Sequence, residues 1–115
     1  MDKEYTDLQF AENEFFRAYN LALKTAGNIQ GTVVRVENLR TEAELEESRL
    51  YVELQNGIKA AEVQASQFKT QNDCNQEKND GIEEEIELLR KQYATKKTAV
   101  LEAATVKLRA IALGR

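Results

Sequence analysis

Apolar residues recur every three or four positions through most of the chain, which is the spacing that places them on one face of an α-helix. The pattern predicts three helices, at about residues 3–26, 32–71 and 82–113. The polar stretch 71–81 joins the last two, and we interpret it as the turn of an antiparallel helical hairpin. The predicted fold is therefore all-α: a helical hairpin or coiled coil that becomes a three-helix bundle when the first helix packs on it.

The first predicted helix carries an unusually wide apolar face. Five of the eight aromatic residues in the chain fall within residues 5–19. So broad a face needs more than one neighbour, and we expect this helix to lie inside a bundle or against a partner chain. The candidate partner interface consists of Leu8, Phe10, Phe15, Phe16, Tyr19 and Leu23.

Two glycine-containing stretches decide the number of helices. Gly27 and Gly31 flank an asparagine, and both residue types tolerate the left-handed conformation that ends helices. A break is therefore favoured here over a continuous helix. The dipeptide Asn56-Gly57 forms turns in other settings, and a break there would produce the alternative fold, a four-helix bundle.

The run from residue 32 to residue 36 is the one place where β-branched residues favour a strand. The chain has no second such run to pair with it. Val33, Val36 and Leu39 continue the helical spacing into the next segment, so a helix is predicted. A strand that pairs with another chain is the alternative.

Closing the hairpin about residue 77 pairs Leu54 with Val100 and leaves the end of the last helix without a partner. The N-terminal helix can fold back at that end, pairing about residues 3–26 with 32–55. Asp80, followed three positions later by Glu83, marks the expected start of the last helix. We predict a single domain, with the aromatic-rich helix in residues 1–30 and the hairpin in residues 31–115.

The charge is distributed unevenly along the chain. The net charge of −4 argues against a general nucleic-acid binder, which needs a basic surface. Seven cations and one acid nevertheless lie between Arg90 and Arg115. We expect these cations to face acidic neighbours within the protein. A weaker candidate is a basic docking patch for an acidic partner or an anionic membrane surface, formed by Arg90, Lys91, Lys96 and Lys97.

The residue types that carry most protein chemistry are scarce. There is no histidine, and the single cysteine, Cys74, has no histidine to form a zinc site or a catalytic pair with. No glycine-rich phosphate-binding motif occurs. We therefore expect no enzyme activity, no cofactor and no metal. One cysteine, no apparent secretory signal and no apolar spanning segment lead us to expect a soluble, cytoplasmic protein.

These observations favour a non-enzymatic coiled-coil assembly subunit that mediates protein–protein interaction within a larger complex, as a hetero- or homo-oligomer. The alternative function is a small helical chaperone or adaptor that holds a client segment against its wide N-terminal face. Rods of the secretion-apparatus or rotor-stalk type belong to this alternative and rest on shape alone.

Overall fold

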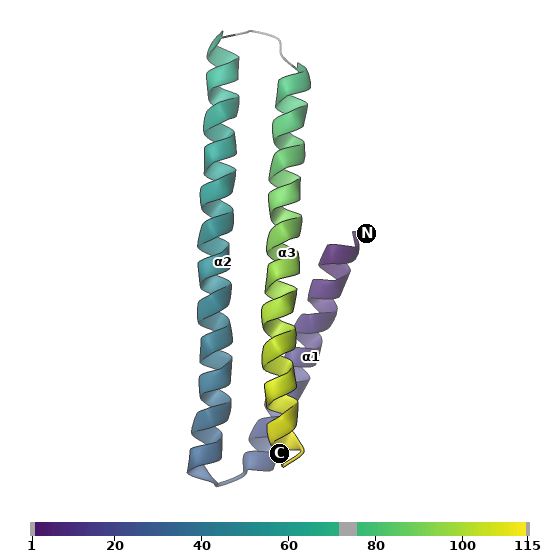
Figure 1. Ribbon diagram of the computed structural model, residues 1–115, viewed down its shortest axis with the longest axis vertical. Coiled ribbons are helices and arrows are strands. Elements are labelled where there is room, and N and C mark those ends of the chain that lie inside the picture. Colours follow the sequence, from purple (N-terminus) through teal and green to yellow (C-terminus); the bar gives the residue numbers. More distant parts are fainter. Residues whose placement is uncertain (1, 72–75, 115) are drawn as a thin grey trace.

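The structure, a computed structural model, describes the backbone of residues 2–71 and 76–114 and the side chains of residues 2–67 and 81–114. It contains three helices, α1 (Lys3–Ala26), α2 (Gln30–Gln71) and α3 (Gln76–Ala112), and no strand within the described ranges. α2 and α3 form a long antiparallel hairpin, and α1 packs beside the lower half of α3 (Figure 1). The predicted all-helical fold of three packed helices is confirmed.

The molecule is a rod that measures 65 × 25 × 15 Å. α1 has 24 residues and is about 36 Å long, so it covers only part of the hairpin. It runs in the same direction as α3 and antiparallel to α2, and its far end lies near the C-terminus (Figure 1). The upper parts of α2 and α3 therefore extend beyond α1 as a two-helix arm.

The break between α1 and α2 lies where the glycines predict it. Gly27 has a φ of 55°, and its N–H donates to the carbonyl of Leu23 at 3.1 Å, which ends α1. α2 begins at Gln30, two residues earlier than predicted. The run 32–36 is helical, as the spacing of Val33, Val36 and Leu39 predicts. Val36 is fully buried within the bundle core, and this packing outweighs the strand preference of β-branched residues.

α2 continues through Gly57 without interruption, so the four-helix alternative is wrong. A Cβ atom added at Gly57 would lie 3.1 Å from the Cδ1 atom of Leu89 on α3. Carbon atoms pack best at about 3.5–4.0 Å, so only glycine fits here without displacing Leu89. Gly57 is thus a point of close helix approach rather than a turn.

The predicted turn at 71–81 is too long. Residues 76–81 already belong to α3, so Asp80 is not the start of the helix. Gln76, Glu77 and Lys78 are polar but favour helices, and a lack of apolar residues does not by itself end a helix. The rest of the predicted turn, residues 72–75 with Cys74, lies outside the described residues.

The earlier start of α3 also changes the register of the hairpin. Gly57 lies against Leu89, and Lys96 donates a hydrogen bond of 2.9 Å to Glu53. Closure of the hairpin about residue 77 would instead have placed Gly57 and Glu53 opposite residues nearer the C-terminal end of α3. The observed register differs from the predicted one by about two helical turns at Gly57.

α1 packs mainly against α3 and makes far fewer contacts with α2, whereas the sequence placed it against residues 32–55. Alanines at the interface allow α1 and α3 to approach closely. At its start, Lys91 lies 3.5 Å from Asp2, and Tyr5 donates a 2.8 Å hydrogen bond to Glu87. The core cluster joins all three helices near the α1–α2 connection and consists of Ala18, Tyr19, Ala22, Val36, Leu108 and Ile111.

Candidate functional site

The structure divides the predicted partner interface on α1 into three groups. Tyr19 is buried in the core, and Phe15 and Leu23 pack against it. Leu8 is half-buried. Phe10 and Phe16 remain 67% and 62% exposed, but their positions point about 120° apart around α1. The aromatic residues therefore contribute to two different surfaces.

The first surface is a groove between α1 and α2, called here the α1–α2 groove. It exists because α1 leans on α3 and leaves a gap toward α2 that side chains only partly fill. Its volume is about 180 Å³, and Leu101 of α3 lies among its lining residues, almost completely buried. The other lining residues are Glu12, Phe15, Phe16, Tyr19, Arg40, Glu44, Glu47 and Lys97.

Polar contacts tie the two walls of this groove together. The hydroxyl of Tyr19 donates to Glu37 of α2 at 3.2 Å, and the guanidinium of Arg40 lies 4.8 Å from the centre of the Tyr19 ring. The Nε of Arg40 donates to Glu44 at 2.8 Å. A cation over an aromatic face stabilises by about 0.5–1 kcal/mol at an exposed site. Tyr19 is thus held by α2 on both its ring and its hydroxyl.

The rim of the groove is weakly acidic. Three of the lining residues, Glu12, Glu44 and Glu47, are carboxylates, and two, Arg40 and Lys97, are cations, of which Arg40 is already hydrogen-bonded to Glu44. Partial burial raises the pKa of Glu47, and the negative charges of Glu12 and Glu44 raise it further, while Lys97 opposes the shift. An ionised carboxylate here is therefore incompletely compensated and attracts positive charge.

The second surface is a groove between α1 and α3, of about 310 Å³, in which Phe10 faces the same space as Val106. Glu14 and Arg109 also line it and form an ion pair that connects α1 to α3. Thr105 lines it as well, and its buried hydroxyl has no hydrogen-bond partner. An unpaired buried hydroxyl costs about 1–3 kcal/mol.

The four basic residues of the second predicted site do not form one surface. Lys91 contacts Asp2 on the α1 side of α3, whereas Lys96 contacts Glu53 on α2. The ammonium of Lys97 lies 5.9 Å from the centre of the Tyr93 ring, and Arg90 is exposed. Lys91 and Lys96 thus fit the expectation that cations of α3 face acidic neighbours within the protein.

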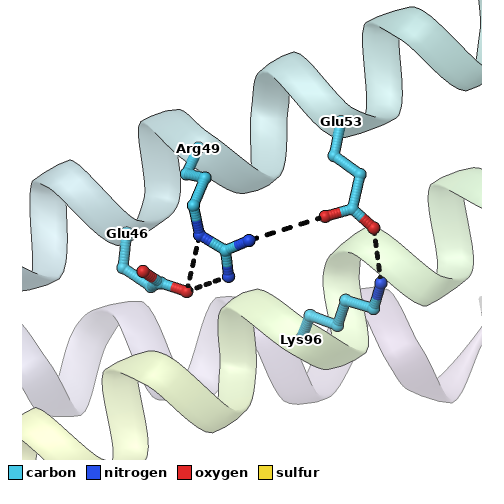
Figure 2. A network of polar contacts seen from close by, with 4 residues as sticks. All are labelled: Glu46, Arg49, Glu53 and Lys96. Atoms are coloured by element: carbon cyan, nitrogen blue, oxygen red, sulfur yellow. Dashed lines mark hydrogen bonds and ion pairs between the residues drawn. The ribbon is translucent and has the colours of Figure 1, made fainter.

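Figure 2 shows a polar network of four residues that connects α2 with α3. Arg49 hydrogen-bonds to Glu46, and one of its nitrogens lies 4.0 Å from Glu53. Glu53 in turn accepts the hydrogen bond from Lys96, which lowers the pKa of Glu53. The four side chains are between 41% and 64% exposed, so the network contributes little to stability but compensates the charges along this edge.

Among the described residues, no group of histidine, cysteine or carboxylate side chains is arranged to hold a metal ion. None of the helices in that part of the chain is both long and apolar enough to cross a membrane. Searches against protein-family models, curated proteins and solved structures found no match to this chain.

Two features were not predicted from the sequence: the acidic rim of the α1–α2 groove and a row of exposed apolar residues on α2. The acidic rim of the α1–α2 groove depends on where α1 sits, and no local signal reports that position. A row of exposed apolar residues on the outer face of α2 could have been found, because its members repeat at intervals of seven and eleven residues. The row consists of Val34, Leu45, Val52 and Val63.

Proposed function

We propose that this protein is a non-enzymatic assembly subunit that binds a helical segment of a protein partner in the α1–α2 groove. The observation that supports the proposal is the position of Phe16, which is 62% exposed at a groove also lined by Phe15 and Tyr19. A large aromatic side chain beside an open apolar groove is the usual arrangement of a protein-binding hot spot.

The chemistry of the groove defines the partner. Its apolar floor suits a helix that presents apolar side chains at positions i, i+3 or i+4, and i+7. Its rim carries three carboxylates and two cations, and Glu44 is paired with Arg40, so a lysine or arginine beside the apolar positions would be favoured near Glu12 and Glu47. Binding a cation next to Glu47 would lower the pKa of this carboxyl, so binding would release protons near the raised pKa.

The exposed fraction of Phe16 gives an estimate of how much this side chain would contribute to the binding free energy. Full burial of a phenylalanine side chain is worth about 1.5–3 kcal/mol. Since roughly two thirds of Phe16 is still exposed, its burial by a partner would contribute about 1–2 kcal/mol, or a five- to thirty-fold change in affinity. A charged residue at this position would cost more, because the charge would be desolvated as well.

The open groove also supports a second candidate function, a helical chaperone or adaptor that holds a client segment transiently. The two functions differ in the lifetime of the complex. An assembly subunit would co-purify with its partner at fixed stoichiometry, which light scattering of the isolated complex measures. An adaptor would release its client during purification and rebind it on addition.

The test uses two variants of the same helix, Phe16→Asp and Phe10→Asp, which alter residues of nearly equal exposure on different sides of α1. Partners captured from native extract by each tagged variant are quantified by mass spectrometry, and circular dichroism checks that the variants are folded. We expect Phe16→Asp to lose the partner that wild type and Phe10→Asp retain. Equal loss with both variants, or retention with both, would refute the groove as the binding site. Unfolding of Phe16→Asp would make Phe16 a core residue and refute it as well.

A further inference from the structure

The outer face of α2 carries a row of four large apolar residues that the described part of the chain leaves about half exposed or more. Val34, Leu45, Val52 and Val63 are 48%, 66%, 56% and 51% exposed. Their spacings of 11, 7 and 11 residues place all four within about 20° around the helix. The row is therefore a straight line about 44 Å long along α2.

The row faces away from the rest of the bundle. The buried residues of α2, such as Val36, Ala43 and Leu50, lie on the opposite side of the helix. Figure 1 shows α2 at one edge of the molecule, with α1 and α3 both on its other side. The four residues lie roughly 10–17 Å apart with polar side chains between them, so it is their alignment on one uncovered face, and not a continuous apolar patch, that indicates an interaction site.

The positions between the apolar residues are also free of charge over most of this line. In a chain with 31% charged residues, the outer face from Val34 to Asn56 carries one charged residue, Arg49, within about 50° of the row. The other polar residues on it are small or neutral: Asn38, Thr41, Ser48 and Asn56. Depletion of charge is a property of interface cores rather than of solvent-exposed helix faces.

The spacing of the row reads the same in both directions, about a midpoint between Ser48 and Arg49. A two-fold symmetric interface brings the same patch of two copies together, so the patch must complement itself. An antiparallel pair of α2 helices about this midpoint places Val34 against Val63 of the second copy and Leu45 against Val52 of the second copy. We propose that a second copy of this chain docks antiparallel on this row.

The charges beside the row are compatible with this arrangement. Glu37 and Lys59 of the second copy reach the same height on the same side of the pair, and symmetry produces this attraction twice. Arg49 of each copy lies near the two-fold axis. Glu46 and Glu53 already flank each Arg49, which reduces the repulsion between the two arginines (Figure 2).

The area of the row indicates a weak dimer. A strip about 44 Å long and about 10 Å wide on each copy corresponds to roughly 900 Å² of buried surface in total. Stable interfaces of standard size bury about 1,200–2,000 Å². We therefore expect dissociation in the micromolar range, and a dimer that forms while the α1–α2 groove on the other side of α2 stays open.

The experiment measures the mass of the full-length chain by analytical ultracentrifugation between about 1 and 500 µM, the range that brackets a weak dimer. Wild type is expected to change from monomer to dimer with concentration. Leu45→Glu and Val52→Lys are each expected to stay monomeric. The matched control is Val106→Glu on α3, at a residue as exposed as Leu45, and it should dimerise as wild type does.

The double variant L45E/V52K tests the direction and register of the pair. The antiparallel register places each new acid opposite a new base, so the double variant should dimerise again, more weakly in high salt. A wild type that is monomeric throughout would overturn the proposal and leave a different protein as the occupant of the row. Failure of the double variant to dimerise, or loss of the dimer in Val106→Glu, would also overturn it.

This inference goes beyond the proposed function and can fail separately from it. Leu45→Glu should leave partner capture by the α1–α2 groove unchanged, and Phe16→Asp should leave the dimer unchanged. Each surface is therefore tested by variants that do not alter the other.

Discussion

The close approach of α2 and α3 at Gly57 predicts an unusual response to Gly57→Ala. In the middle of an exposed helix, alanine is more stable than glycine by about 1 kcal/mol. At Gly57 the added methyl carbon would meet two methyl carbons of Leu89, at 3.1 and 3.4 Å. The gain in helix propensity therefore competes with a steric overlap at the helix interface.

The size of the overlap decides the net effect. Adding a methylene to a packed core costs about 1–3 kcal/mol. Leu89 is half-buried and also lines a small groove with Leu50 and Leu54, so its methyl groups can shift by the few tenths of an ångström required. The cost lies at the lower end, about 1 kcal/mol, and cancels the propensity gain. We expect Gly57→Ala to leave the free energy of unfolding nearly unchanged.

The assay is urea denaturation followed by circular dichroism, with two further comparisons. Ala60→Gly, at an exposed position one turn away on α2, should destabilise by about 1 kcal/mol and so measures the local propensity difference. In a Leu89→Ala background the overlap disappears, and Gly57→Ala should then stabilise by about 1 kcal/mol. If Gly57→Ala stabilises wild type by as much as it stabilises Leu89→Ala, the helices do not approach closely at this residue and the reasoning is wrong.

Three other predictions concern single side chains. Burial raises the pKa of Glu47, so this carboxyl favours the folded state only at low pH, and the contribution is lost as the pH rises through the raised pKa. Glu47→Gln should therefore raise the melting temperature near neutral pH and have little effect below about pH 3.5. The hydrogen bond from Lys96 lowers the pKa of Glu53, so the ionised carboxylate stabilises the folded state above its ordinary pKa, and this stabilisation is lost as the pH falls. Glu53→Gln should therefore lower the melting temperature near neutral pH only. Thr105→Val removes a buried hydroxyl without a hydrogen-bond partner and should stabilise the folded state by about 1 kcal/mol in urea denaturation. Thr98→Val removes a 2.7 Å hydrogen bond to the carbonyl of residue 94 and should destabilise the folded state by about 1 kcal/mol.

The helices themselves could be predicted from the sequence because their signals are local. Three- and four-residue spacing identified all three segments, and Gly27 marked the end of α1 through its left-handed conformation. The role of Gly57, in contrast, could not be predicted from a local signal. A glycine that ends a helix and one that allows close packing look alike in sequence, and only the position of Leu89 distinguishes them.

The start of α3 and the packing of α1 were harder to predict for a different reason. A polar segment such as 76–81 can be a turn or an exposed helix, because its residue types favour a helix while its lack of apolar residues removes the periodic signal. The choice of α3 over α2 as the main neighbour of α1 is a tertiary contact between segments about ninety residues apart, and helical periodicity contains no information about it. The α1–α2 groove depends on that choice, so its acidic rim could not be predicted.

The proposed binding surfaces involve α2 more than the sequence indicated. The sequence pointed to the aromatic face of α1, but Tyr19 is buried in the core, and Phe15 and Leu23 pack against it. α2 contributes one side to the groove beside Phe16 and presents its other side as an uncovered apolar row. Arg40, Glu44 and Glu47 lie roughly 90–150° around α2 from the row, so the proposed partner segment and the proposed second copy would use different faces of this helix. A subunit with two such surfaces can connect partners in pairs, which a single aromatic patch on α1 could not do.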